Sequence, residues 1–444
     1  MKRAILWMAG MGILVSGTAQ AQMPEATGKT TSEVGVPVAR TLTLSEAEAL
    51  AIKNNPQITI GKLQALESLQ YVREARAALL PTAYLSVTAV DAKPGSRIAA
   101  GGLNNSVLYP RAAEGASVGQ LITDFGRSTS LLSSSQYQAK AEDQNAAATR
   151  AQIIMAVDQA FYGALETQAL VSVARQTVST RQVNVDKIKA LTNAKLKSDL
   201  DLSFSSVDLS RGKLLLLEAE NNFQGALAAL SAILGFPDEQ DFQLVEEASQ
   251  LTAPTLDVSP LIQQALQQRP EVKSLEDQVA QAQKFANAEH DLKRPTVSAL
   301  GVVGEAPVRD NHIPSWYGAV GVNINIPVFN GFLYGARAQA ADLQSEVNRQ
   351  KLADMRNNIA RDVRNAWQNT NSAYERLSVT QELRNEASLA LDLSQTRYNL
   401  GLGSIVELSE AELQKTEADI ADTDAKYGYR LSQMVLAYAV GTSK

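Results

Sequence analysis

Two glutamates late in the chain have the residue type and spacing of a cation-attracting site. Glu407 and Glu410 follow Gly401, Gly403 and Ser404 in the segment "RYNLGLGSIVELSEAE". Because glycine permits a tight turn and serine is a favoured N-cap, a helix is expected to start here with both carboxylates on one face. In one chain, the helix dipole alone explains acidic residues at this place. Repeated around a symmetry axis, the same pair would form a ring that favours cations.

The remaining residues offer little other chemistry. The 444 residues include no cysteine, which excludes disulfides, thiol catalysis and an acylated N-terminal cysteine. The two histidines, His290 and His312, have no partner at metal-ligand spacing, so we expect no metal site, no cofactor and no enzyme. The segment "TGKT" resembles the end of a phosphate loop, but Met23 stands where a glycine is required. The net charge of −6 gives no basic surface for nucleic acid.

The N-terminus has the features of an exported protein. Lys2 and Arg3 precede an apolar run over residues 4–15, and the small residues of "AQA" follow. We interpret residues 1–21 as a secretory signal peptide, followed by a flexible segment over residues 22–41. The alternative is a single membrane anchor, although the run is shorter than the roughly 20 residues that a spanning helix needs. No later stretch is apolar for long enough to span a membrane as a helix.

The rest of the chain contains an internal repeat. "LTLSEAEALAIKNNPQI" is echoed by "LDVSPLIQQALQQRPEV", and "NAKLKSDLDLS" is echoed by "NLGLGSIVELS". Pro270 follows Pro56 by 214 residues, and Pro295 follows Pro81 by the same interval. Matched landmarks in one order indicate a duplication. The predicted parts are a first unit over residues 42–234, a linker or equatorial segment over residues 235–255, and a second unit over residues 256–441.

Each unit is expected to be mainly helical. Prolines mark the starts and stops of its shorter helices, and residues 336–400 contain no glycine or proline. The predicted helices are about 45–54, 56–80, 127–191 and 199–234 in the first unit, and about 259–268, 270–294, 336–400 and 405–439 in the second. A helix of about 65 residues is about 100 Å long. Two shorter helices laid end to end match that length, so we expect antiparallel rods packed laterally as in coiled coils.

Each unit is also expected to contribute two strands, at about 82–90 and 116–124 and at about 296–303 and 317–328. "AVGVNINIP" alternates apolar and polar residues, which is the pattern of a membrane strand with one face in lipid. Four strands cannot close a barrel with a pore, and open sheet edges are not stable in lipid. Three chains would supply twelve strands, enough for a barrel. The alternative is a small soluble sheet.

Aromatic residues and turn-forming residues flank these strands. Five aromatics near the strand ends are candidates for a membrane girdle, or for the core of a soluble sheet in the alternative: Tyr84, Tyr109, Trp316, Tyr317 and Phe329. Four residues are expected to mark the junctions between helices and strands: Pro81, Pro295, Gly126 and Gly331.

In the order of its motifs, the sequence resembles the TolC-like outer-membrane efflux protein family. "LTLSEAEALAIKNNP", "TDFGR", "IPVFNG" and "RYNLGLGSIVELSEAE" carry the resemblance, which covers about residues 42–441. It implies a homotrimer with a twelve-stranded β-barrel in outer-membrane lipid and an α-barrel tunnel in the periplasm. The implied function is an exit duct for drugs or proteins in tripartite efflux or type I secretion. Its partners would be a periplasmic adaptor (membrane fusion) protein and an inner-membrane ABC or proton-driven pump.

Two other functions stay open on the sequence. A soluble periplasmic coiled-coil scaffold or adaptor would also be exported and helical. A conventional porin would need many more strands and almost no helix.

The resemblance also implies roles for individual residues. Glu407 and Glu410 fall where the family has an aspartate pair at its periplasmic entrance. Tyr398 matches the family's gate tyrosine, and Asp201 matches the position of its acidic partner. The adjoining glycines, Gly401 and Gly403, are the other gate candidates.

One gate position departs from the family pattern. Gly403 falls where the family has its gate arginine, so that ion pair cannot form in this chain. We expect the closed state to be held in another way, through Arg397 or Lys197.

Overall fold

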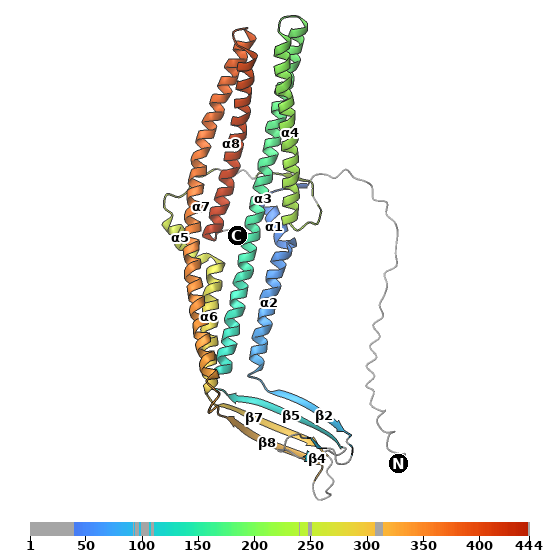
Figure 1. Ribbon diagram of the computed structural model, residues 1–444, viewed down its shortest axis with the longest axis vertical. Helices are drawn as coiled ribbons and strands as arrows, with labels where there is room; N and C mark the ends of the chain where they lie inside the picture. Colours follow the sequence, from blue (N-terminus) through green and yellow to red (C-terminus); the bar gives the residue numbers. More distant parts are fainter. Residues whose placement is uncertain are drawn as a thin grey trace, which may run out of the picture. The chain divides into compact units, whose positions relative to one another are not determined.

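The structure, a computed structural model, describes residues 40–91, 93, 97–98, 106–107, 111–238, 240–246, 251–306 and 314–442 (Figure 1). The predicted signal peptide and residues 22–39 of the N-terminal segment lie outside these residues. The helices form two series of the same order. The first is α1 (Leu44–Asn54), α2 (Pro56–Ala77), α3 (Arg127–Asn193) and α4 (Asp199–Ile233); the second is α5 (Ser259–Gln268), α6 (Pro270–His290), α7 (Leu333–Asn399) and α8 (Ile405–Val440).

The starts of the helices follow from local sequence. Asn55 ends α1 and also caps α2, because its side chain accepts a hydrogen bond from the backbone N–H of Gln57 at 2.9 Å. Pro56 then occupies the first turn of α2, where its missing N–H costs little. Pro270 starts α6 in the same way.

The second helix of each series ends earlier than predicted. α2 stops at Ala77 and α6 at His290, before Pro81 and Pro295. Tighter turns fill the gap, with the N–H of Leu79 bonded to the carbonyl of Arg76 at 3.0 Å in the first series and a short 3₁₀ turn in the second. The prediction missed this because a last turn often tightens to 3₁₀ geometry before the chain changes direction.

The long helices α3 and α7 each lie alongside two shorter ones. α2 and α6 accompany the halves of α3 and α7 nearer the sheet, and α4 and α8 accompany the far halves (Figure 1). Packing contacts give the lateral order α2–α3–α6–α7 near the sheet and α4–α3–α8–α7 at the far end. α2 and α4 therefore form one flank of the helical layer, and α7 forms the other. The predicted pairing of one continuous rod with one broken rod is confirmed.

Four strands form one antiparallel sheet in the order β2-β5-β7-β8. They are β2 (Thr82–Val90), β5 (Arg111–Thr123), β7 (Thr296–Glu305) and β8 (Trp316–Asn325). β5 begins earlier than predicted. β8 ends before the predicted residue 328, because Pro327 has no backbone N–H to donate to a hydrogen bond between strands. Within the described residues, β2 and β8 each pair on one side only. The sheet thus has two open edges, one from each repeat.

Two further strand pairs were not predicted. β1 (Arg40–Leu42) pairs in parallel with β6 (Phe242–Leu244), and β3 (Arg97–Ile98) pairs with β4 (Ser106–Val107). Arg40 and Thr41, which were predicted to belong to the flexible segment, are therefore part of a strand, and the predicted linker contains another strand. Strands of two or three residues are too short to give an alternating pattern in the sequence.

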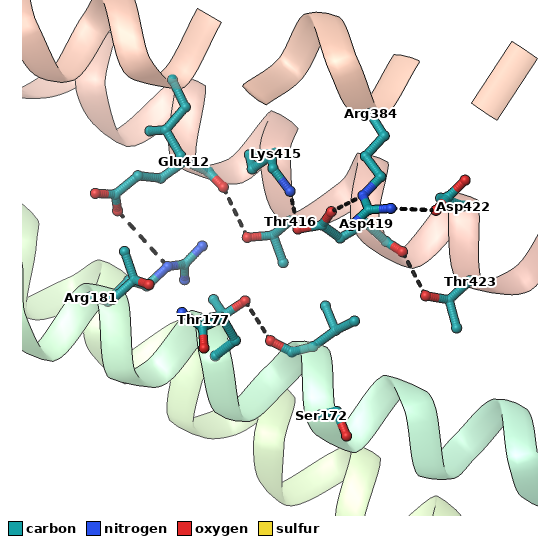
Figure 2. Close-up of a pocket in the computed structure, with 14 residues that line it drawn as sticks. Ser172, Thr177, Arg181, Arg384, Glu412, Lys415, Thr416, Asp419, Asp422 and Thr423 are labelled. Atoms are coloured by element: carbon teal, nitrogen blue, oxygen red, sulfur yellow. Dashed lines mark hydrogen bonds and ion pairs between the residues drawn. The ribbon is translucent and has the colours of Figure 1, made fainter. Parts of the chain in front are cut away.

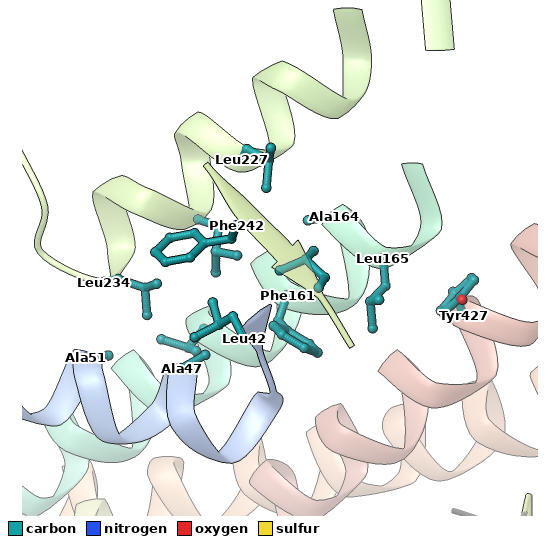
Figure 3. Close-up of a cluster of buried hydrophobic side chains, with 13 residues drawn as sticks. Leu42, Ala47, Ala51, Phe161, Ala164, Leu165, Leu227, Leu234, Phe242 and Tyr427 are labelled. Atoms are coloured by element: carbon teal, nitrogen blue, oxygen red, sulfur yellow. The ribbon is translucent and has the colours of Figure 1, made fainter. Parts of the chain in front are cut away.

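The β1–β6 pair covers the largest apolar cluster of the described residues (Figure 3), beside α1 and the end of α4 that lies midway along the helices (Figure 1). Leu42 from β1 and Phe242 from β6 pack with Phe161 of α3 and Leu230 of α4, all almost completely buried. Burial of such side chains stabilises the fold by about 1.5–3 kcal/mol each. This cluster therefore fixes the end of α4 and the strand β1 onto α3. Among the described helices, none has the length and apolarity required to cross a bilayer.

Candidate functional site at the helix tips

The two helix pairs end in similar turns, which we call the tips. The first pair is α3 and α4, and the second pair is α7 and α8. Lys195 in the first tip and Gly401 in the second both adopt left-handed backbone conformations, with φ of 60° and 75°. The next helix starts at an N-cap serine in each case, Ser198 or Ser404. The repeat detected in the sequence is therefore a repeat of backbone geometry.

Glu407 and Glu410 lie on the first turns of α8, as the sequence predicted. The N–H of Glu407 bonds to the Ser404 hydroxyl at 3.1 Å, and its carboxylate accepts from Nε of Arg397 at 3.0 Å. The exposed carboxylate of Glu410 accepts from the neutral amide of Gln414 at 3.1 Å. The negative charge of Glu407 is thus partly balanced by its neighbour, whereas Glu410 has a neutral partner. Within the described ranges, no three metal-binding side chains lie close enough together to hold an ion.

Tyr398 lies at the contact between the two helix pairs. Its side chain is 3% exposed and packs with Ile188, Ile405 and Leu408. Burial, with a smaller contribution from the charge of Asp201, raises the pKa of Tyr398 to about 12. Its hydroxyl has no hydrogen-bond partner among the described residues. Tyr398 is therefore held by apolar packing.

Asp201, the predicted acidic partner of Tyr398, has a local role in the structure. Its carboxylate accepts from the backbone N–H of Ser198 at 3.2 Å, while its own N–H bonds to the Ser198 hydroxyl at 3.1 Å. These two bonds form a capping box at the start of α4.

Of the two residues expected to replace the gate arginine, Lys197 joins the helix pairs. Its Nζ lies 3.7 Å from the ring centroid of Tyr398 and 3.5 Å from the carbonyl oxygen of that residue. Arg397 bonds instead to Glu407 and to the carbonyl of Leu402, at 3.2 Å, so both of its partners belong to its own pair.

Gly403 is closely surrounded by the residues of its own tip. A Cβ at this position would lie 3.3 Å from Cβ of Arg397 and 3.3 Å from Oε2 of Glu407. A larger residue here would therefore disturb the pairing of these two side chains.

Sequence reasoning missed a buried cluster of charged residues farther from the tips. Arg181 of α3, Asp208 of α4 and Glu412 of α8 are 7–8% exposed. A signal was present, because Arg181 lies seven residues from both Ala174 and Ile188, which are buried. A charge at an apolar heptad position indicates a specific partner.

At the other end of the helices, the four predicted junction residues lie between a helix and a strand: Pro81, Pro295, Gly126 and Gly331. The two glycines have φ of 111° and 61°, which side chains rarely adopt. Arg294 supports the first turn by donating to the carbonyl of Phe125 at 2.6 Å and pairing with Asp291 at 3.1 Å.

The candidate girdle aromatics that the structure describes are exposed at both ends of the sheet. Tyr84 and Phe329 lie at the helical end, and Trp316 and Tyr317 at the opposite end. The exposed fractions are 65% for Tyr84, 78% for Phe329, 69% for Trp316 and 45% for Tyr317, so these rings do not form the core of a small sheet. Tyr109 lies outside the described residues.

The Tyr317 ring also explains two glycines. A Cβ on Gly115 or on Gly304 would lie 2.6 Å from its hydroxyl. The ring therefore covers a strip of the sheet where neighbouring strands have no side chains.

The sequence matches the family described as "Outer membrane efflux protein" over residues 49–236 and 261–442. It is 23% identical over 419 residues to outer membrane protein TolC of Vibrio cholerae, covering 90% of each chain. It is 21% identical over 313 residues to outer membrane protein TolC of Escherichia coli, covering 67% of this chain and 61% of the relative.

Solved structures share the fold. The Campylobacter jejuni CmeC outer membrane channel matches with a TM-score of 0.78 and 18% identity, covering 96% of this chain and 95% of CmeC. The Neisseria gonorrhoeae MtrE outer membrane channel matches with a TM-score of 0.75 and 18% identity, covering 96% and 99%. The two matched segments together span most of the chain and coincide with its two repeats. The chain is therefore an outer-membrane protein that belongs to the outer membrane efflux protein family of TolC-like channels.

Proposed function

We propose that three copies of this chain close into a channel that serves as the exit duct of a tripartite efflux or type I secretion system. The channel would conduct drugs or proteins from an inner-membrane ABC or proton-driven pump, joined through a periplasmic adaptor. Family membership supports an efflux channel, and the solved relatives CmeC and MtrE are described as outer membrane channels.

The observation that carries this proposal is the presence of two unsatisfied flanks on one chain. At the sheet, the open edges are β2 on one side and β8 on the other, and every residue of β8 is exposed. Unpaired edges are unstable in lipid, and pairing β8 of one copy with β2 of the next removes them. Four strands from each of three chains give twelve, a number that closes a barrel.

The helical flanks have matching apolar stripes. On α4, the exposed residues Leu200, Phe204 and Val207 follow one helix face, and on α7 the exposed residues Val379 and Leu383 do so. Each stripe lies within roughly 30 Å of its tip, at about 1.5 Å per residue. Because the stripes lie on opposite flanks, they would make a head-to-tail contact that repeats around a ring.

A ring of three copies would gather carboxylates at the periplasmic mouth. Glu407 and Glu410 from three chains make six acidic groups around one axis. Such a ring favours cations and binds polyvalent metal ions. Arg397 pairs with Glu407 and partly neutralises the negative charge that Glu407 adds to the ring. Glu410 therefore contributes more than Glu407 to the attraction of cations.

Membrane fractionation and native electrophoresis test the channel. The wild-type chain is expected in the outer-membrane fraction as a detergent-stable trimer. Leu383→Asp places a charge in the α7 stripe and is expected to give monomers. Asn385→Asp adds the same charge at an exposed position outside the stripe and is expected to leave the trimer intact. Release of a monomeric wild-type chain by osmotic shock would favour the scaffold or adaptor function instead.

A further inference from the structure

The two faces of the four-stranded sheet differ in chemistry. Successive side chains of a strand point to opposite faces, so alternate residues of β8 share a face. Val320, Val322 and Ile324 lie on one face and are exposed, whereas Asn323 and Asn325 lie on the other. Because Cα partners in neighbouring strands share a face, the register extends both faces across all four strands. We call them the apolar face and the polar face.

The space around two glycines of β7 agrees with this assignment. A Cβ on Gly301 would lie 3.8 Å from Cγ1 of Val320, on the apolar face. A Cβ on Gly304 would lie 2.6 Å from the hydroxyl of Tyr317. Because the two glycines are three positions apart, these Cβ atoms point to opposite faces. The ring of Tyr317 therefore lies on the polar face.

Tyr84 belongs to the polar face as well. It pairs with Ser117, which the register places on the same face as Tyr317. Trp316 has the opposite orientation, since a Cβ on Gly318, on the apolar face, would lie 3.9 Å from its ring. In a membrane barrel the apolar face contacts lipid and the polar face lines the lumen. Trp316 therefore remains a candidate for the girdle, whereas Tyr84 and Tyr317 would face water.

Two apolar residues of β7 lie on the polar face between these tyrosines. Val302 is in register with Tyr84 through Ser117, and Leu300 lies two positions farther along β7. We call Tyr84, Leu300, Val302 and Tyr317 the lumen patch. Apolar side chains on a face that otherwise carries serine, threonine and asparagine indicate a local surface for an apolar part of a cargo molecule.

The lumen patch also has open space beside it. Leu300 is exposed, and its Cα partners on both sides are glycines, Gly119 and Gly321. A Cβ on Gly321 would meet no atom within 4 Å. A flat molecule can therefore approach the backbone on either side of Leu300.

The two tyrosines lie on the strands at the open edges. Tyr84 belongs to β2 and Tyr317 belongs to β8. In the proposed trimer, β8 of one copy pairs with β2 of the next, so a tyrosine would lie on each side of every seam. Two tyrosines from each of three copies would surround the lumen with six rings.

A cavity in the helical layer has a different surface. It has a volume of about 520 Å³ and lies between residues 172–181 of α3 and 412–423 of α8. Figure 2 shows that Thr177, Arg384 and Asp419 contribute to its walls. None of the described residues that line it is aromatic, and its Arg384 pairs with Asp419 at 3.1 Å. Of these two surfaces, the lumen patch is the one that offers ring faces.

We propose that Tyr84 and Tyr317 line the barrel lumen and favour planar aromatic cations as cargo. The inference rests on the proposed trimeric channel. The face of a tyrosine ring attracts a cation, and its flat surface stacks with another ring. The proposed carboxylate ring of Glu407 and Glu410 at the helix tips would favour the same sign of charge.

Cysteine labelling tests which face each tyrosine occupies. Because the chain has no cysteine, Tyr84→Cys and Tyr317→Cys each introduce a single thiol. In trimers reconstituted in lipid, a charged, water-soluble methanethiosulfonate is expected to label both at least about tenfold faster than Val320→Cys, because a thiol in lipid does not ionise. Mass spectrometry of the labelled fraction over time measures the rates.

Block of single-channel current tests the contact with cargo. The probe is ethidium, a planar aromatic cation, added on the barrel side, and tetrapropylammonium is the comparison cation without a ring. Tyr84→Leu and Tyr317→Leu are each expected to weaken ethidium block by about two- to fivefold, the effect of losing an exposed cation–π contact. Block by tetrapropylammonium is expected to stay unchanged.

Two further variants control for other effects of substitution. Trp316→Leu removes a ring from the apolar face of the same strand and is expected to leave block by both cations unchanged. Tyr317→Phe keeps the ring and is expected to keep ethidium block. All variants are first checked as trimers by native electrophoresis.

The outcomes distinguish the two proposals. A wild-type chain that forms no trimer contradicts the channel and the lumen patch together. Trimers in which Tyr84→Cys and Tyr317→Cys are labelled as slowly as Val320→Cys contradict the lumen patch alone. Equal ethidium block in the wild type and both leucine variants contradicts the preference for aromatic cations, as does an equal loss of block in Trp316→Leu.

Discussion

The ammonium group of Lys197 lies 3.7 Å from the ring centroid of Tyr398, although 201 residues separate the two in the chain. Lys197 belongs to the tip of the first helix pair, and Tyr398 belongs to the last turn of α7. The contact therefore joins the two repeats at the place where a gate would open. We propose that it takes the place of the family's gate ion pair, because Gly403 stands in this chain at the position of the gate arginine.

Replacing Lys197 with methionine should loosen the tips. The substitution keeps the apolar stem but removes a cation–π contact of about 0.5–2 kcal/mol. We expect faster hydrogen exchange of the amides of residues 194–204. Lys189→Met alters an exposed lysine of α3 and should leave that exchange unchanged. Equal exchange rates in both variants would mean that Lys197 does not hold the tip.

Replacing Tyr398 with phenylalanine should not weaken the tip. The hydroxyl is buried without a hydrogen-bond partner among the described residues, so its removal relieves a desolvation cost of about 1–3 kcal/mol. We expect unchanged or higher thermal stability and wild-type conductance. An increase in conductance would instead indicate that the hydroxyl makes a gate hydrogen bond in the assembled channel.

Neutralising the acidic ring should reduce cation selectivity, and Glu410→Gln should have the larger effect. Glu407 is already paired with Arg397 at 3.0 Å, whereas the partner of Glu410 is the neutral Gln414. Reversal potentials in a salt gradient and block by polyvalent cations measure the difference. A larger effect of Glu407→Gln would show that the Arg397 pair opens in the assembled channel. Unchanged selectivity in both variants would reject the ring.

Asp158 should make stability depend on pH. Burial, followed by the charge and hydrogen bond of Glu48, raises the pKa of Asp158 from 3.8 to about 7. The folded state binds the proton of the Asp158 carboxyl more tightly than the unfolded state does. Protonation of Asp158 therefore stabilises the folded protein fully below about pH 4, and this stabilisation is lost as the pH rises toward 7. Each unit of pKa difference corresponds to roughly 1.4 kcal/mol.

Thermal unfolding of the trimer at pH 4.5 and pH 8 measures this effect. Asp158→Asn should reduce the pH dependence and be the more stable protein at pH 8. Asp238→Asn changes an exposed carboxylate and should follow the wild-type profile. If the thermal stability of Asp158→Asn depended on pH as strongly as that of the wild type, another group would be responsible for the pH dependence.

The sequence determined the elements and their duplication. Prolines fix the starts of α2 and α6, and the absence of glycine and proline over residues 336–400 permits the long helix α7. Helix starts and strand alternation depend on neighbours within a few residues, so they can be read locally. The turn glycines Gly126, Gly331 and Gly401 were found for the same reason, since each supports a positive φ.

Only the tertiary structure decided which residues meet. The partners Arg181 and Glu412, like Lys197 and Tyr398, lie more than 200 residues apart, and no local rule relates them. The strand order β2-β5-β7-β8, which joins the two repeats through β5 and β7, likewise depends on how the helices bring the strands together. Local preferences select each helix and strand, but burial of charges and apolar side chains across the whole fold selects their partners.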